Sequence, residues 1–182
     1  MKQLFTLFIL FAFLALIPGA VPVFAKTEAE GAAQLSIHAE TQDSRADQLE
    51  AYLAAHQSPV TDQASHFVAE ADRLGLDWKL VPAILGVEST FGRFIPTGSY
   101  NGWGWGIFTG AQDGVHFKNW ADGITQVSEG LRHNYVDRGA QSIEQIGRIY
   151  AASPRWAGNI RFFMSQIEGF IPTNPDQLKV VI

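Results

Sequence analysis

Hydrophobic residues recur every three or four positions from residue 44 to residue 171, which is the spacing of one buried face of an α-helix. Capping and turn residues divide this pattern into about six segments. The expected N-terminal caps are Ser44, Thr61, Asp77, Asn119 (with Asp122), Ser142 and Ser153, and the expected ends are Pro59, Gly75, Ser89, Gly139, Tyr150 and Gly169. The pattern predicts a mainly α domain.

The segment from Phe91 to Gly114 departs from this periodicity. It holds seven Gly and two Trp residues. Residues 105–109 and 115–118 have the spacing of two short strands around a glycine-containing turn. We therefore expect a small glycine-rich β-hairpin inserted among about six helices. Segments that break local rules in a regular chain are often functional.

The first 25 residues have the three parts of a secretory signal peptide. A positive start at Lys2 precedes an uncharged run from Leu4, and Val23-Phe24-Ala25 supplies a cleavage site. The alternative is an uncleaved membrane anchor, against which Pro18 argues. We predict a signal peptide at 1–25, a flexible tether at 26–43, the domain at 44–171 and a tail at 172–182. We therefore expect the chain to be secreted or to lie in the cell envelope. It would contact a membrane only if residues 1–25 are not cleaved.

Charge and composition exclude several classes of function. The formal net charge is −5, and removal of Lys2 with the signal peptide makes it −6. This acidic balance argues against a nucleic-acid partner. The chain has no Cys, and its five His residues are scattered, so neither thiol catalysis nor a metal site is expected. We expect no cofactor, and a monomer held together by packing alone.

Glu88 is the strongest candidate for chemistry. It is the one charged residue between Lys79 and Arg93, and it lies near the end of an apolar helix, just before the glycine-rich segment. Burial disfavours the charged form of a carboxyl, so its pKa should be raised. A carboxyl that stays partly protonated is suited to be a general acid. The alternative is a structural Glu that is solvated or bonded to the next loop.

Two further segments can build a binding site. Residues 99–106 alternate glycine with aromatic rings, which lets the backbone approach a ligand and offers flat faces to sugar rings. At least one of Trp103 and Trp105 should instead belong to the core. This segment matches neither a phosphate-binding loop nor a serine-hydrolase elbow. Tyr150 lies at the corner between two helices, where its hydroxyl either enters a cleft or remains at the surface.

Together these segments resemble the lysozyme superfamily and, more narrowly, the bacterial peptidoglycan N-acetylglucosaminidase family. Its domain is also described as mannosyl-glycoprotein endo-β-N-acetylglucosaminidase-like. Glu-Ser-Thr-Phe-Gly at 88–92 resembles the family's catalytic Glu-Ser-x-x-Gly. Asn-Gly-Trp-Gly at 101–104 resembles its Asn-x-aromatic-Gly strand, and Tyr-Ala-Ala-Ser-Pro at 150–154 is similar to its Tyr-Ala-x-x-Pro corner. The resemblance covers about residues 60–168.

The resemblance implies a lysozyme-like helical fold and an exported glycoside hydrolase. Its partner would be the GlcNAc-MurNAc glycan strand of peptidoglycan, cut in the manner of an endo-β-N-acetylglucosaminidase. Glu88 and Tyr150 are the implied catalytic residues. The expected substrate-binding residues are Ser89, Tyr100, Asn101, Trp103, Gly104, Trp105 and Gly106.

The sequence does not determine which glycosidic bond is cleaved or which group is the second catalytic residue. Lytic transglycosylases share the Glu-Ser motif, but Gly-Trp-Gly-Ile stands at 104–107 where they usually have a Gly-Leu-Met-Gln-like strand. A transglycosylase, a muramidase, a non-catalytic wall-binding domain and an envelope protein that binds a protein partner are the alternatives. A second carboxylate, usual in glycosidases, has candidates in Asp113, Asp122 and Glu129.

Overall fold

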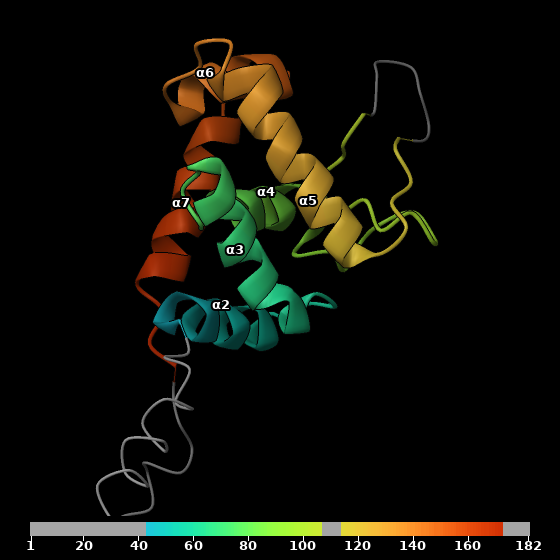
Figure 1. Cartoon of the computed structure of the whole chain (residues 1–182), viewed down its shortest axis with the longest axis vertical. Coiled ribbons are helices and arrows are strands. Elements are labelled where there is room, and N and C mark those ends of the chain that lie inside the picture. Colours follow the sequence, from blue (N-terminus) through green and yellow to red (C-terminus); the bar gives the residue numbers. More distant parts are fainter. Residues whose placement is uncertain (1–42, 107–113, 173–182) are drawn as a thin grey trace, which may run out of the picture. The chain divides into compact units, whose positions relative to one another are not determined.

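A computed structural model describes residues 43–106 and 114–172, all within one unit, Thr41–Ile182 (Figure 1). The described residues form six α-helices. These are α2 (Ser44–Ala55), α3 (Ala64–Leu74), α4 (Leu80–Ser89), α5 (Trp120–Leu131), α6 (Ile143–Tyr150) and α7 (Trp156–Glu168). A 3-10 turn, η1 (Thr61–Gln63), precedes α3, and a π-helical segment, η2 (Arg132–Val136), extends α5. The expected mainly α fold is confirmed.

Helix α4 provides the apolar centre on which the other helices pack. Its sequence is apolar nearly all round, as expected of a helix buried on every side. Ala83, Ile84 and Leu85 are fully buried, and α7 packs along α4 with Ile160 and Ile167 inward. Helix α3 lies against both α2 and α5 (Figure 1). The last turn of α4, which carries Glu88, is thereby fixed by the core.

Several helix boundaries follow the predicted caps. Asn119 accepts a hydrogen bond from the backbone of Asp122, and Ser142 accepts one from Gln145. Gly75 ends α3 in the left-handed conformation. The prediction of Ser44 as the first cap was wrong, because Asp43 accepts the hydrogen bond from Arg45 N–H.

The second predicted cap, Thr61, also differs in the structure. Residues 61–63 form a 3-10 turn before α3, and the Thr61 hydroxyl donates to the carbonyl of Ser58 instead of accepting from a helix N–H. The prediction placed the helix start a few residues too early, because a Thr hydroxyl bonds the backbone of a turn as readily as that of a helix.

The expected β-hairpin is not seen. Its tip, residues 107–113, lies outside the described residues, and no strand occurs in the parts on either side. One backbone hydrogen bond, from Val115 N–H to the carbonyl of Trp105 at 3.0 Å, joins the two sides. The predicted signal peptide and residues 26–42 and 173–182 also lie outside the described ranges. In 43–106 and 114–172, no helix is long and apolar enough to cross a bilayer.

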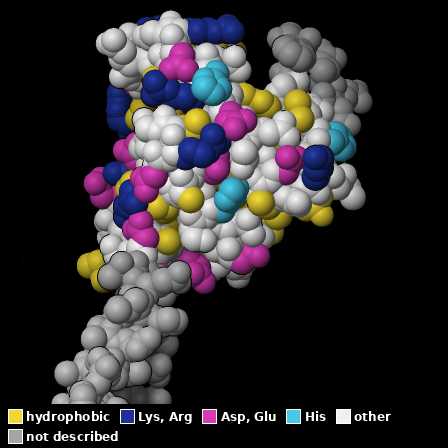
Figure 2. All heavy atoms as spheres, viewed as in Figure 1, with side chains coloured by type: hydrophobic (Ala, Val, Ile, Leu, Met, Phe, Trp, Pro, Cys, Tyr) yellow, Lys and Arg dark blue, Asp and Glu magenta, His cyan; other side chains and the backbone are white. Residues whose placement is uncertain are grey.

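Ion pairs on the surface connect neighbouring helices. Arg45 bridges Asp43 and Asp72, which links α2 to α3, and Arg73 bridges Glu70 and Glu129, which links α3 to α5. On the face shown in Figure 2, acidic and basic side chains accordingly lie interspersed. Exposed pairs of this kind contribute little to stability, so the fold depends mainly on its core.

Candidate active site

Glu88 is an exposed residue in the last full turn of α4, and its carboxyl is partly shielded from solvent by the surrounding protein. The indole Nε1–H of Trp156 donates a hydrogen bond to Glu88 Oε1 at 2.7 Å. The surrounding protein removes much of the carboxyl's hydration and raises its pKa, whereas the hydrogen bond from Trp156 opposes this rise. Glu88 is therefore accessible to a ligand and is also shifted towards its protonated form.

Aromatic side chains surround this carboxyl. The ring of Tyr150 stacks on that of Trp156, with centroids 4.9 Å apart and planes at 24°. Trp105 and Tyr135 also lie near Tyr150, at centroid distances of 5.9 Å and 6.1 Å. These four rings come from the glycine-rich segment, η2, α6 and α7. Trp105, Tyr135 and Tyr150 line a common hollow, whereas Trp156 is buried.

The Tyr150 hydroxyl is hydrogen-bonded to the glycine-rich segment. It donates a hydrogen bond of 2.6 Å to the backbone carbonyl of Trp103. Burial raises the pKa of the Tyr150 hydroxyl well above its ordinary value, and electrostatic interactions with Glu88 and Tyr135 raise it further. The hydroxyl thus stays protonated, and it holds the segment that faces Glu88.

Two glycines on helices make room for the indole rings of the site. A methyl group at Gly130 of α5 would lie 2.2 Å from the Trp105 ring, and one at Gly147 of α6 would lie 2.9 Å from the Trp156 ring. Both distances are shorter than a van der Waals contact. These helix positions therefore have to be glycine for Trp105 and Trp156 to keep their places.

A hollow of about 360 Å³ opens beside Tyr150. Its walls are Gly104, Trp105, Gly106, Asn134, Tyr135, Ile149 and Tyr150. A second hollow of about 280 Å³ is lined by Trp105, Gln126, Glu129, Gly130, His133 and Asn134. Because both share Trp105 and Asn134, they form neighbouring parts of one groove. Segment η2 supplies Asn134 and Tyr135, as π-helical turns often do at functional sites.

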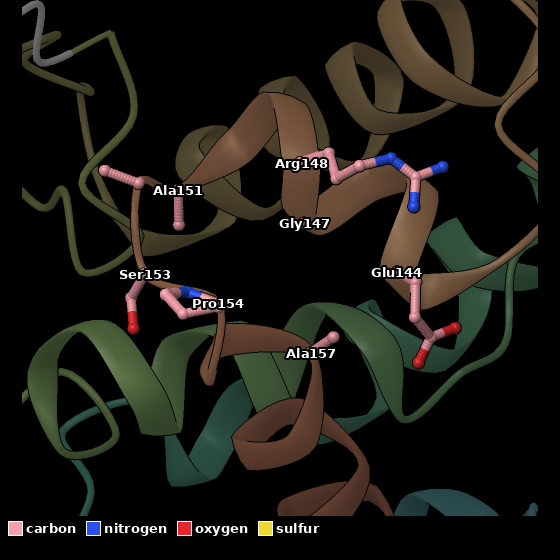
Figure 3. A pocket seen from close by; sticks show the side chains of 8 residues that line it. Glu144, Gly147, Arg148, Ala151, Ser153, Pro154 and Ala157 are labelled. Carbon is pink, nitrogen blue, oxygen red and sulfur yellow. The ribbon is translucent and has the colours of Figure 1, made fainter.

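A separate pocket of about 440 Å³ lies between α6 and α7 (Figure 3). Gly147 and Ala157 line its middle, Arg148 and Glu144 lie at one end, and Ala151 lies at the other end with Ser153 and Pro154 (Figure 3). Glu144 is paired with Arg161. No aromatic ring belongs to its wall. The groove at Trp105 has aromatic walls, and its residue Gly104 lies next to Glu88, so the groove is the stronger candidate.

The structure brings some of the predicted site residues together near Glu88. Gly104 lies against Glu88, because a methyl group there would be 3.7 Å from Glu88 Oε2. Trp105 and Gly106 line the hollow with Tyr150. Tyr100 lies apart from these walls, with its ring edge-on to Trp120 at 5.6 Å.

Other predicted residues lie behind the groove. Trp103 is fully buried and donates to the carbonyl of Val81, which confirms that one of the two Trp residues belongs to the core. Ser89 is buried, donates to Leu85 C=O and accepts from Gly92 N–H. The Asn101 amide bonds Trp105 and Val115. These contacts order the site from behind, and substrate binding by these side chains stays a prediction.

Sequence reasoning missed Trp156, Tyr135 and Asn134. Trp156 lies 68 residues after Glu88, and its helical spacing only marks it as a core residue. Tyr135 and Asn134 reach the groove because the chain follows a π-helical turn, for which the sequence has no evident signal. The one local hint is Gly147, which is unusual in the middle of a short helix.

Among the candidates for a second carboxylate, Asp122 accepts hydrogen bonds from Lys118 N–H and the Gln126 amide at the start of α5, and Glu129 pairs with Arg73 at the edge of the groove. Asp113 lies outside the described residues. No cluster of potential metal ligands occurs in 43–106 and 114–172. A scan against protein-family models and a search of curated proteins found no match to this chain.

Proposed function

We propose that this domain is a glycosidase that cuts the glycan strands of peptidoglycan, with Glu88 as the general acid. The observation that carries the proposal is Glu88, an exposed residue with a raised pKa, whose Oε2 would lie 3.7 Å from a methyl group at Gly104 in the wall of the aromatic groove. The substrate class rests on the three sequence motifs. The same motifs underlie the proposal of a lysozyme-like fold, whereas the proposal of export to the cell envelope rests on the predicted signal peptide at 1–25.

The proposed reaction begins with a sugar ring placed against Trp105. Glu88 protonates the glycosidic oxygen as the carbon–oxygen bond breaks and an oxocarbenium-like transition state develops. Partial shielding of the carboxyl from water helps in two ways, because it favours the protonated acid and strengthens its electrostatic interaction with the leaving oxygen. Tyr150 keeps the glycine-rich wall in place during this step.

Three routes can complete the reaction. A carboxylate such as Asp113 or Glu129 can activate water, the 2-acetamido group of the substrate can act as nucleophile, or the C6 hydroxyl of muramic acid can attack. The first two routes give a hydrolysed reducing end, and the third gives a 1,6-anhydro end. Analysis of the products therefore separates the third route from the first two.

The test is digestion of purified peptidoglycan by residues 26–182, with mass spectrometry of the released fragments. GlcNAc reducing ends indicate a glucosaminidase, MurNAc reducing ends a muramidase, and 1,6-anhydro ends a transglycosylase. Glu88→Gln should lower release by at least roughly 100-fold, the usual contribution of a general acid. Glu50→Gln, on the exposed face of α2, is the matched control and should keep full activity.

Two results would contradict the proposal. Equal release by the wild type and Glu88→Gln would remove Glu88 from the chemistry. Absence of release from several wall types, with binding to the wall retained, would favour a non-catalytic wall-binding domain. Glu129→Gln, measured alongside, tests the one described carboxylate that lines the groove.

A further inference from the structure

We propose that the two oxygens of Glu88 have different tasks: Oε2 delivers the proton, and Oε1 is reserved by Trp156, which acts as a positioning residue. This inference rests on the proposed function and assigns the reacting atom within it. It is drawn from the hydrogen bond of Trp156 and from the open space beside Gly104.

The first step concerns the proton. An indole N–H is a donor only, so the atom that it contacts has to accept. Oε1 lies 2.7 Å from Nε1 of Trp156, which is a full hydrogen bond. If the acid proton were on Oε1 and pointed at the indole, two hydrogens would face each other. The carbonyl oxygen of a carboxylic acid is also a better acceptor than its hydroxyl oxygen, so the hydrogen bond from Trp156 favours the protonated form that carries its hydrogen on Oε2.

The second step concerns access. Oε2 is the heavy atom nearest to the position that a side chain at Gly104 would occupy, 3.7 Å away. Gly104 has no side chain and lines the hollow with Trp105 and Tyr150. The missing side chain leaves the approach to Oε2 open on the groove side. A glycosidic oxygen in the groove thus meets the oxygen that holds the proton.

The third step concerns the orientation of the carboxyl. Trp156 is buried, its ring stacks on Tyr150, and Gly147 provides the space for it. The indole is thereby immobile, and its hydrogen bond fixes the rotation of the Glu88 side chain. When the O–H bond of Oε2 breaks and a bond to the glycosidic oxygen forms, the negative charge that remains is shared with Oε1, which already accepts a hydrogen bond. No other reactant is needed.

The test that needs no substitution is an NMR titration of the wild type. The indole N–H resonance of Trp156 should shift as Glu88 titrates, and it should stay protected from solvent exchange in both protonation states. In Glu88→Gln the shift with pH should vanish. If the N–H exchanges as fast as a free indole once Glu88 is protonated, the proton is on Oε1 and the proposal is wrong.

Trp156→Phe tests the positioning role, since it keeps a stacked ring and removes the donor. The pKa of Glu88 should rise, because a bond that stabilises the carboxylate is lost. The alkaline limb of kcat/KM should move to higher pH by the same amount. We expect kcat to fall roughly 10-fold with KM nearly unchanged, because the acid is less well oriented. An unchanged pH profile overturns the role.

Gly104→Ala tests access to Oε2, with Gly98→Ala as its matched control. Both glycines have a positive φ, 63° and 73°, so alanine strains the backbone similarly at each. A methyl group at Gly98 meets no atom within 4 Å, whereas one at Gly104 meets Oε2. We expect kcat/KM to fall roughly 10-fold more in Gly104→Ala than in Gly98→Ala. Equal activities of the two variants contradict the assignment.

These experiments separate the inference from the proposed function. If Glu88→Gln keeps its activity, the glycosidase proposal fails, although the NMR titration can still show the hydrogen bond. If Glu88→Gln is inactive but Trp156→Phe keeps the wild-type profile, Glu88 is the acid and the role of Trp156 is wrong.

Discussion

At the scale of single residues, two opposing influences set the protonation of Glu88. Surrounding protein disfavours the carboxylate, and one hydrogen bond from Trp156 favours it. The first influence could be predicted from the apolar sequence around position 88, and the direction of the pKa shift confirms it. The second could not, because it depends on a residue from another helix. A raised pKa has a cost in stability, which can be measured.

The stability of the wild type should fall as pH rises from about 4.5, the ordinary value, through the raised pKa of Glu88. In this interval the folded chain binds more protons than the unfolded chain, so the free energy of unfolding decreases with pH. Glu88→Gln lacks this loss. Thermal unfolding should therefore show the variant to be more stable than the wild type at pH 7, with the difference vanishing below pH 4.5. A constant difference at all pH values would contradict the raised pKa.

Tyr150→Phe should destabilise the domain. The variant removes the donor to the Trp103 carbonyl and leaves a buried acceptor unpaired, which costs about 1–3 kcal/mol. Denaturant unfolding measures this loss. Turnover by the folded fraction tests whether Tyr150 also acts in catalysis, since an unchanged value would limit its role to holding the glycine-rich segment.

At the scale of elements, the groove forms because helices α4 and α5 pack unusually closely against the glycine-rich segment. The glycine-rich segment packs against α4 at Gly102, where a methyl group would lie 2.2 Å from Leu85. Helix α5 admits Trp105 at Gly130, and η2 then turns Asn134 and Tyr135 towards the same space. The wall of the groove thus depends on single helix positions rather than on long segments.

Gly130→Ala should push Trp105 out of the groove wall. Its methyl group would overlap the indole ring, so we expect a loss of about 1–3 kcal/mol in stability and a several-fold rise in KM for glycan. Gly158→Ala is the matched control, because Gly158 lies in α7 with no atom within 4 Å of the new methyl group. That variant should gain up to about 1 kcal/mol from helix propensity. A similar response of the two variants would contradict the close packing at Trp105.

The sequence predicted elements better than it predicted the site. Caps at Asn119 and Ser142 were correct because the hydrogen bonds that define them are local. Asp43 replaced Ser44 because two adjacent residues can both cap a helix, and only the path of the chain decides between them. The site depends on contacts between residues far apart in sequence, such as Glu88 with Trp156 and Trp105 with Tyr135. These contacts follow from packing, which the periodicity of hydrophobic residues does not specify.

At the scale of the whole described unit, the first and last helices are fastened to each other. The side-chain amide of Gln48 in α2 donates to the backbone carbonyls of Ile167, Glu168 and Phe170, at 2.8, 2.8 and 2.9 Å. Carbonyls at a helix end lack the usual intrahelical partners, and the Gln48 amide supplies a donor to them; the Ile167 carbonyl also accepts from Phe170 N–H. The chain has no Cys and therefore no disulfide, so this contact between α2 and the end of α7 is non-covalent.

Gln48→Ala should lower the free energy of unfolding by about 1 kcal/mol, because the partly buried carbonyl of Phe170 loses its side-chain donor, while Ile167 keeps Phe170 N–H and Glu168 is exposed to water. The measurement is denaturant unfolding of the whole unit. Gln166→Ala, at an exposed position of α7, is the matched control and should change stability by less than about 0.5 kcal/mol. Equal effects would show that the Gln48 contacts are not needed for closure.

The Gln48 contact also has a mechanical consequence. Figure 1 shows the start of α2 beside the end of α7, so the chain enters and leaves the described unit at neighbouring points. Tension applied between residues 43 and 172 would load the three hydrogen bonds of Gln48 first and would peel α2 from α7 one contact at a time. If the protein is attached to a bead by one end and pulled at the other, the contact between α2 and α7 should open first. The force should reach α4 and Glu88 only after that contact has opened.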